Sequence, residues 1–303
     1  MRVVPASPLP QSLVDLTHAI PYTGLGTMQG THMNWGTLGQ AERDAAYNNQ
    51  VACPGGAAYV AALREVSLAM RAAHPAHLDL QYGPTQREAW DLFPGPAGAP
   101  TLVFIHGGYW QRNDREGAAA IMQGALATGW SAALPGYTLA PDATLTQIVG
   151  QIDTALSWLG THGAAHGVGG PIVVAGWSAG GHLAALMLQH PAVHAALPIS
   201  GLFELGPLRD TYLNNKLHLT DEEMAALSPQ RLAMPDKPMT IAYGSAELPA
   251  LVANSRDLHA RRAAAHRVGA LLPVAGADHF TIIDAIRRPD GPILAMARLL
   301  LPG

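Results

Sequence analysis

One serine of the chain has a setting typical of a catalytic nucleophile: Ser178, within Gly176-Trp177-Ser178-Ala179-Gly180. The pentapeptide follows the apolar run PIVVA and precedes GHLAALMLQ, which has the composition of a helix. In a G-x-S-x-G pattern, small residues permit a sharp strand-to-helix turn that exposes the serine hydroxyl above a sheet edge. The pattern alone is weak in a glycine-rich chain, and its alternative is a serine in an ordinary turn. The strand–turn–helix setting favours the nucleophile.

A second glycine-rich segment, HGGYW at positions 106–110, directly follows the apolar run TLVFI. Glycine lets the backbone approach a ligand closely, and backbone N–H groups in such a turn can bind a developing oxyanion. We expect the amides of Gly108 and Tyr109, with that of Gly107 as a further candidate, to act together with the amide of Ala179, which follows the nucleophile.

A serine nucleophile needs a base, and the base needs a group that orients it. His279 follows the last apolar run, ALLPVAG, and this position selects it among 14 histidines. His106 is expected to shape its loop instead. The acid belongs between the serine and the histidine in chain order, and Glu247 is the carboxylate in the loop after KPMTIAYG. Glu204 and Asp210 are the reserve candidates.

The elements that must position these residues alternate between short apolar runs and helical patterns. The strands are predicted at 101–105, 131–135, 171–177, 195–200, 237–244 and 270–276, and the helices at 57–73, 116–128, 145–159, 181–189, 251–266, 282–287 and 292–301. Continuous apolar strands separated by helices indicate a parallel sheet that is covered on both faces. HLDLQYG (77–83) and REAWDLF (87–93) alternate apolar and polar residues around Gly83-Pro84, which predicts an antiparallel hairpin at one edge.

The chain shows no linker that would divide the sheet, so residues 1–303 are expected to form a single α/β domain. Residues 1–56 include a Gly/Pro/Thr-rich stretch, which predicts an extended arm or loop over roughly the first 40 residues and makes the segment a candidate lid. Residues 205–230 interrupt the alternation and are expected to contribute to a small cap.

Composition excludes several classes of protein. The chain of 303 residues has 49% hydrophobic and 13% charged residues and a net charge of −4, which argues against disorder and against a nucleic-acid partner. Its single cysteine, Cys53, permits no intrachain disulfide and no cysteine-based zinc site. The first residues lack an export signal, and no apolar run is long enough to span a membrane, so a cytoplasmic protein is expected.

These motifs together resemble the arylformamidase (kynurenine formamidase) group of α/β-hydrolases, which is similar to the hormone-sensitive-lipase branch. The segments that carry the resemblance are HGGYW (106–110), GWSAGGHL (176–183) and SGLFELGPLRDTYLN (200–214), with AYNNQ (46–50), YTLAPDA (137–143) and DHFTIID (278–284). The resemblance covers roughly residues 44–300.

The resemblance implies an α/β-hydrolase fold and a metal-free serine hydrolase without cofactor, acting on an N-formyl or small acyl amide, or an ester, of an aromatic substrate. The family's nucleophile, acid and base match Ser178, Glu247 and His279. Aspartate is also common at the acid position, and glutamate is one methylene longer. Because esterases and amidases share these motifs, the resemblance does not fix the substrate.

Aromatic side chains near the motif loops are the expected walls of a substrate pocket, because they stack well on an aryl group. They are Trp110, Trp177, Phe203, Tyr212 and Phe280, with Trp35 and Tyr47 reaching over from the N-terminal arm. For Trp177 and Phe203, ordinary core packing is an equally good interpretation.

A weaker similarity points to metal-dependent, cyclase-type formamidases, through VDLTHAI (14–20) and GTHMNWG (30–36). The metal-binding positions of that motif read Met28, His32, Asn34 and Leu38 here. A single imidazole cannot hold a catalytic metal, so no metal chemistry is expected.

The sequence is therefore consistent with three functions: a small-aryl amidase of the arylformamidase kind, a carboxylesterase with the same triad, and a non-catalytic hydrolase-fold binding protein. A complete triad argues against the third. The expected partner is a small aromatic amide or ester, with no nucleic acid and no membrane, and the sequence leaves a homodimer open.

Overall fold

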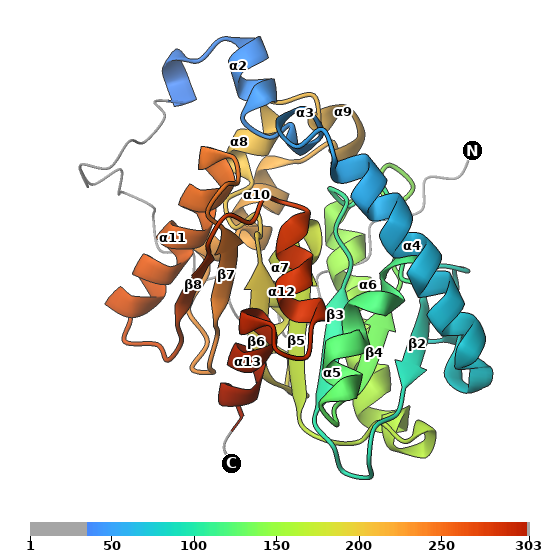
Figure 1. Ribbon diagram of the computed structural model, residues 1–303. Helices are drawn as coiled ribbons and strands as arrows, with labels where there is room; N and C mark the ends of the chain where they lie inside the picture. The colour runs from blue at the N-terminus through green and yellow to red at the C-terminus, as the bar shows by residue number, and fades with distance from the viewer. Residues whose placement is uncertain (1–34, 302–303) are drawn as a thin grey trace.

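The computed structural model describes residues 35–301, and within them eight strands form one sheet in the order β1-β2-β4-β3-β5-β6-β7-β8 (Figure 1). β2 pairs antiparallel with β1 and β4, and every other pair is parallel. The strands are β1 (Leu80–Gln81), β2 (Ala89–Phe93), β3 (Thr101–Ile105), β4 (Ser131–Pro135), β5 (Ile172–Trp177), β6 (Val193–Ile199), β7 (Ile241–Gly244) and β8 (Leu271–Val274). The predicted mostly parallel sheet and its antiparallel hairpin are confirmed.

Helices cover both faces of the sheet, and two separate apolar clusters form beneath them. One cluster includes the buried faces of α6 (Leu145–His162), α7 (Ala179–Leu186) and α11 (Pro249–Ala264). The other includes those of α4 (Gly56–Ala73), α5 (Gln123–Ala127), α12 (Asp284–Arg287) and α13 (Pro292–Leu299), which lie on the viewer's side of the sheet in Figure 1. β3 and β5 therefore lie between two layers, as their continuous apolar sequences require.

The segment predicted as one helix over 116–128 begins as a 3-10 helix, η3 (Glu116–Met122), before α5. The segment departs from α-helical geometry because its backbone bonds to Ser67, a buried residue of α4. The hydroxyl of Ser67 accepts a hydrogen bond from the amide of Ala120 and contacts the carbonyl of Gly117. Backbone groups that would close regular α-helical turns are thereby bonded to a neighbouring helix instead.

The described part of the N-terminal segment is helical, where an extended arm had been expected up to about residue 40. It comprises η1 (Trp35–Thr37), α2 (Gln40–Ala45) and α3 (Asn49–Ala52), and the remainder of the expected arm lies outside the described residues. The segment contacts the interruption at 205–230, because the Trp35 indole and the Gln40 amide both bond to Asp210 at 3.1 and 2.9 Å.

The interruption itself contains α8 (Gly206–Arg209), α9 (Asn214–Leu217), α10 (Asp221–Leu227) and a 3-10 turn, η6 (Pro229–Arg231). The remaining short 3-10 helices are η2 (Pro75–His77), η4 (Gly163–His166), η5 (Met187–Gln189) and η7 (Thr281–Ile283). α2, α3, α8 and α9 gather at one end of the sheet in Figure 1. These short helices bring the N-terminal segment and the 205–230 segment together at that end.

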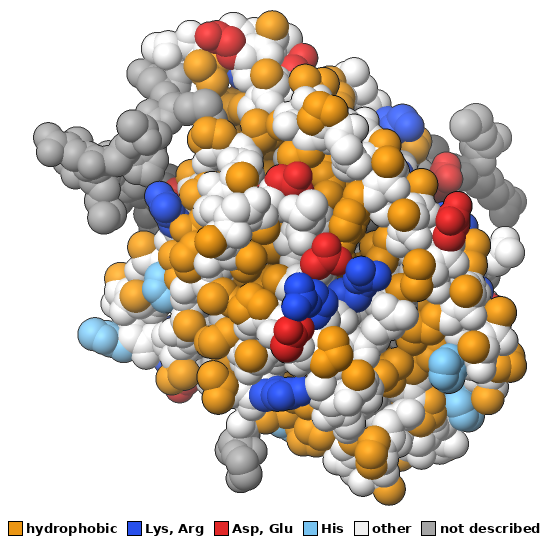
Figure 2. Space-filling model, in the orientation of Figure 1, with side chains coloured by type: hydrophobic (Ala, Val, Ile, Leu, Met, Phe, Trp, Pro, Cys, Tyr) orange, Lys and Arg blue, Asp and Glu red, His pale blue; other side chains and the backbone are white. Residues whose placement is uncertain are grey.

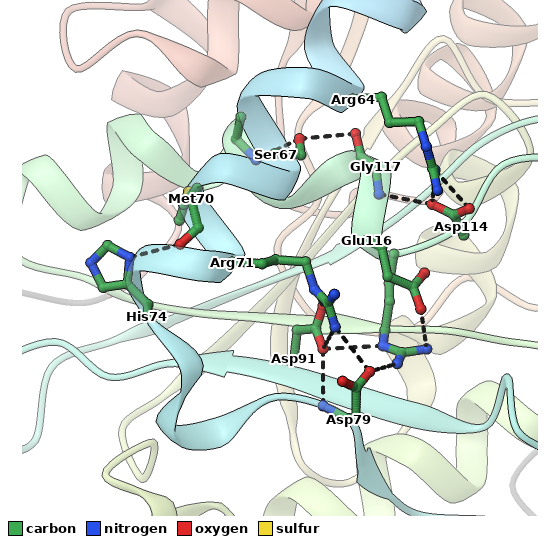
Figure 3. Close-up of polar contacts among 12 residues, drawn as sticks. Arg64, Ser67, Met70, Arg71, His74, Asp79, Asp91, Asp114, Glu116 and Gly117 are labelled. Atoms are coloured by element: carbon green, nitrogen blue, oxygen red, sulfur yellow. Dashed lines mark hydrogen bonds and ion pairs between the residues drawn. The ribbon is translucent and has the colours of Figure 1, made fainter.

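A buried ion network ties α4 to the antiparallel edge of the sheet (Figure 3). The carboxylate of Asp91, on β2, is fully buried and accepts hydrogen bonds from Arg71 Nε at 2.7 Å and Arg115 Nε at 3.2 Å. Asp79 bonds to both arginines from the surface side. The arrangement leaves Asp91 with no uncompensated charge, as burial of a carboxylate requires.

The surface matches the low charge content of the sequence. On the face shown in Figure 2, hydrophobic atoms are spread widely and charged side chains of both signs gather in small mixed groups. Among the described helices, including the 18-residue α4 and α6, none is long and apolar enough to cross a bilayer.

Candidate active site

Ser178 occupies a strained turn between β5 and α7. Its backbone has φ 58° and ψ −118°, a left-handed conformation that costs energy for any residue with a Cβ. The turn is possible because positions 176 and 180 are glycines and carry no Cβ. A Cβ at Gly176 would overlap the carbonyl of Gly180, and a Cβ at Gly180 would overlap the carbonyl of Ile105. The two glycines of the pentapeptide are therefore required by close backbone approach, and this packing keeps the strained serine at the carboxyl end of β5.

Glu247 and His279 form a buried pair at the carboxyl ends of β7 and β8. Oε2 of Glu247 lies 3.2 Å from Nδ1 of His279, and both side chains are almost fully buried. The second oxygen, Oε1, accepts from the hydroxyl of Ser200 at 2.5 Å and from the amide of Gly244 at 2.7 Å. Because these donors hold Oε1, the carboxylate presents Oε2 to the imidazole in one orientation.

Ser178 and His279 line the same cavity, which has a volume of about 220 Å³. Glu247 meets His279 from the other side, so the three residues predicted as a catalytic set come together in space. The other lining residues come from α3, α4, the loop after β3, the end of β5 and the loop after β8: Asn49, Gln50, Ala57, Val60, Gly108, Tyr109, Arg112, Asn113, Trp177 and Phe280.

The amides expected to bind an oxyanion lie around this cavity. Gly108 and Tyr109 line it, in left-handed backbone conformations with φ 115° and 53°. Within the described chain, neither amide donates to another backbone carbonyl, and Ala179 is the first residue of α7, where the amide has no partner inside the helix. The carbonyl of Gly107 accepts from the side chain of Asn113 at 3.2 Å, which fixes the loop.

A second, smaller cavity of about 80 Å³ adjoins the first and shares Val60, Asn113 and Trp177 with it. Gly107 forms part of its wall, and a Cβ at Gly107 would lie 3.1 Å from the Cβ of Ser178. Its lining combines the apolar Leu63, Phe104 and Ile121 with the polar Arg64, His106 and Asp114.

Of the aromatic residues predicted to form the substrate pocket, Trp177 and Phe280 line the Ser178 cavity, and the structure places the others elsewhere. Trp110 is fully buried with its ring 5.0 Å from that of His182, and Phe203 is a fully buried core residue. Trp35 and Tyr47 pack edge to face on each other at 5.8 Å, away from the lining. Tyr212 lines a separate surface depression with Asp44 and Arg209.

His106 and His182 are buried neutral side chains beside the site. Burial lowers the pKa of each from 6.5 to about 4. His106 stacks on Tyr137 at 4.3 Å between ring centroids, and Nδ1 contacts the carbonyl of Gly107 at 2.9 Å. Nε2 of His182 lies 2.7 Å from the carbonyl of Leu227. Both rings therefore brace loops around Ser178.

The reserve acids are engaged elsewhere. Glu204 forms an ion pair with Arg231, and Asp210 accepts from Trp35. No group of three or more potential metal ligands occurs within residues 35–301, and Met28, His32 and Asn34 lie outside them.

Four polar residues that sequence reasoning did not select also line the cavity: Asn49, Gln50, Arg112 and Asn113. Arg112 is the one Lys or Arg among the lining residues, and its guanidinium lies 6.0 Å from the ring centroid of Tyr109. For Asn49, the segment AYNNQ was the available signal, since it contributes to the family resemblance.

Comparison with known proteins agrees with this geometry. The BD-FAE family model matches residues 94–196, which include the glycine-rich loop at 106–110 and the turn that carries Ser178. Kynurenine formamidase of Danio rerio is 25% identical over 247 residues, 76% of this chain and 83% of that protein. A crystal structure from Silicibacter sp. TM1040, described as a candidate thioesterase, is 32% identical with a TM-score of 0.75, covering 85% of this chain and 99% of that one.

The sheet, the strained turn at Ser178 and these similarities define the class: the chain belongs to the α/β-hydrolases and is a hydrolase. Within that class it is arylformamidase-like, with further similarity to Esterase LipQ of Mycobacterium tuberculosis, which is 34% identical over 42% of this chain and 35% of that protein.

Proposed function

We propose that the protein is a metal-free serine hydrolase that cleaves an N-formyl or small acyl amide of an aromatic substrate through an acyl-enzyme. The observation that carries the proposal is the convergence of Ser178 and the Glu247–His279 pair on one cavity beside unpaired loop amides. The similarity to kynurenine formamidases supports a formamide as the substrate.

In the proposed reaction, Oγ of Ser178 attacks the substrate carbonyl carbon and its proton passes to Nε2 of His279. Glu247 holds the imidazole through Nδ1 and stabilises its charged form. The amides of Gly108, Tyr109 and Ala179 bind the oxyanion, and each such donor typically contributes about 2.7–4 kcal/mol.

The tetrahedral intermediate collapses with cleavage of the carbon–nitrogen bond, and the leaving nitrogen takes the proton from His279. Water then attacks the acyl ester while His279 accepts its proton. That proton returns to Oγ of Ser178 as the carboxylic acid, formic acid in the case of a formamide, departs.

The lining residues support an aromatic substrate with a small acyl part. Trp177, Tyr109 and Phe280 offer ring surfaces for an aryl group, and the adjoining 80 Å³ cavity is too small for a long acyl chain. Arg112 supplies a positive charge that suits a substrate carboxylate, such as that of N-formylkynurenine.

The decisive test is steady-state kinetics on N-formylkynurenine and 4-nitrophenyl acetate, side by side, with Ser178→Ala as the control. A kcat/KM of about 10⁴ M⁻¹s⁻¹ or more on the formamide, lost in the folded Ser178→Ala variant, is the expected result. Wild-type-like turnover by Ser178→Ala would overturn the mechanism.

The second function is a carboxylesterase for short-acyl or aryl esters, favoured by the similarity to Esterase LipQ of Mycobacterium tuberculosis. Turnover of the activated ester without turnover of the formamide would establish it. Covalent labelling of Ser178 by a fluorophosphonate separates both enzymes from a hydrolase-fold binding protein, which would stay unlabelled.

A further inference from the structure

The wall of the Ser178 cavity carries one charged side chain that a ligand can reach. Arg112, in the loop after β3, is exposed to solvent and lines the cavity. Among the lining residues that the structure describes, none of the others is a Lys, Arg, Asp or Glu. A positive charge on the wall of a cavity attracts anionic ligands and raises their local concentration, so the charge of the substrate is a property that this site can select.

The guanidinium of Arg112 is available to a ligand, in contrast to the arginines near it in the chain. Arg115 pairs with the buried carboxylate of Asp91. Arg87 donates to the carbonyl of Tyr137. In the part of the chain that the structure describes, Arg112 forms no ion pair and its side chain donates no hydrogen bond. Its N–H donors therefore face solvent and can bind a ligand without breaking an existing contact.

The backbone of Arg112 is fixed beside the amides expected to bind the oxyanion. A Cβ at Gly108 would overlap the carbonyl oxygen of Arg112, so glycine permits this close approach. The amide of Gln111 donates to the carbonyl of Gly108 at 3.0 Å, which closes the turn. The guanidinium lies 6.0 Å from the ring centroid of Tyr109, another lining residue. The same short loop therefore presents both the expected oxyanion amides and the positive charge.

The ligand group that suits this side chain is a carboxylate. A planar guanidinium binds a carboxylate through two parallel N–H···O bonds, and it has no acceptor for an ammonium group. A ligand with its reacting carbonyl at Ser178 can place an aryl ring against Trp177 or Phe280, which line the same cavity. A carboxylate on the aryl part is then the substituent that Arg112 can bind.

We infer that Arg112 is a specificity-determining residue that binds a carboxylate on the aryl part of the substrate, so that the cavity selects anionic aromatic compounds over neutral ones. The inference rests on the proposed function, because it names the substrate class of the same cavity. The carboxylate keeps its charge throughout the reaction, so Arg112 binds the ground state and the transition state alike and acts mainly on KM. The preference holds for amides and esters, since it does not involve the bond that is cleaved.

The test compares the ortho, meta and para formamidobenzoates with the matching formamidobenzamides, in which a neutral amide replaces the carboxylate. For at least one ring position, Arg112→Gln should lower the ratio of kcat/KM for the carboxylate to that for the carboxamide about fivefold, through KM. Arg112→Lys keeps the charge and should retain part of the preference. Arg298→Gln removes a charge from α13, which lies at the opposite end of the sheet from α3 in Figure 1, and should leave the ratio unchanged. A ratio that Arg112→Gln changes at none of the three positions overturns the inference.

Binding to the folded Ser178→Ala variant keeps this inference separate from the hydrolase proposal. Calorimetry should show that at least one formamidobenzoate binds about fivefold more tightly than its carboxamide at low salt, and that about 0.5 M NaCl reduces the difference by screening. The difference should disappear in Ser178→Ala/Arg112→Gln. Equal binding of each pair, or binding of neither compound, overturns the role of Arg112 even if hydrolysis is confirmed. A difference that depends on Arg112, without turnover by the parent enzyme, supports the inference and contradicts the hydrolase proposal.

Discussion

The indole of Trp177 donates a hydrogen bond from Nε1 to the backbone carbonyl of His279, over 2.8 Å. Trp177 immediately precedes the serine, and its ring centroid lies 5.3 Å from that of the imidazole. The residue beside the proposed nucleophile therefore holds the loop that carries the proposed base. The G-x-S-x-G turn and the loop after β8 are joined by a contact that neither motif describes.

Trp177→Phe keeps an aromatic ring on the cavity wall and removes this hydrogen bond. A hydrogen bond of this kind contributes about 1 kcal/mol to stability, so we expect the melting temperature to fall by about 2–4 °C. Because the loop that carries His279 also loses this contact, we expect kcat to fall roughly fivefold. Steady-state kinetics and thermal unfolding on the same preparation would check this. An unchanged kcat would mean that the loop after β8 is positioned without the indole.

Glu247→Gln should lower kcat by roughly 10²–10⁴-fold, because the amide cannot stabilise a charged imidazole. Ser200→Ala provides the matched control, since it removes one bond to Oε1 while the charge and the bond from Gly244 remain. A loss of less than about tenfold is expected there. Similar small losses in both variants would show that the carboxylate charge is not used.

Asp91→Ala should destabilise the fold by about 3–5 kcal/mol, because it leaves the buried ends of Arg71 and Arg115 without their shared carboxylate. Urea unfolding measures this change, and the labelling of Ser178 should persist at low temperature. Asp290→Ala breaks an exposed pair with Arg288 and should have no measurable effect. Equal midpoints for the two variants would contradict the assigned role of the network in Figure 3.

Acidification should destabilise the protein through its buried histidines. The pKa of His182 is lowered by burial to about 4, below the ordinary 6.5, so the folded chain binds fewer protons between these values. Stability from this group is complete above about pH 6.5 and declines as pH falls towards 4, by roughly 2.5 kcal/mol at pH 4.5.

His182→Gln keeps a donor for the carbonyl of Leu227 and cannot titrate. The difference in unfolding free energy between pH 7 and pH 4.5 should therefore be smaller in this variant by about that amount, with the His106 contribution remaining. Parallel pH dependence in wild type and variant would show that folding does not lower the pKa of His182.

The framework of the fold followed from local patterns. β3 and β4 have the predicted bounds, because apolar runs between turn residues are strong local signals. The convergence of Ser178, Glu247 and His279 followed from the rule that parallel strands end at one sheet edge. These predictions needed no knowledge of side-chain directions in loops.

The residues that line the cavity are decided by the directions of side chains in loops. Of the aromatic residues expected there, Trp177 and Phe280 line the cavity. Trp110 lies in a left-handed backbone conformation, with φ 57°, that turns its ring into the core against His182. Asn49 lies on the cavity wall with its side-chain amide bonded to the hydroxyl of Tyr109, which is 60 residues away in the chain. Neither position has a local signature, because each is decided by tertiary contacts.

The separation of the cavity wall from the reacting groups has a consequence for how such a protein can change. Asn49, Ala57 and Val60 precede the first strand of the sheet, whereas the proposed reacting groups Ser178, Glu247 and His279 all follow β3. One part of the cavity wall is therefore encoded apart from the proposed reacting groups, while Tyr109, Arg112, Trp177 and Phe280 of the same wall are encoded among them. A mutant library confined to residues 46–63 would vary the first part of the wall without replacing a proposed catalytic residue.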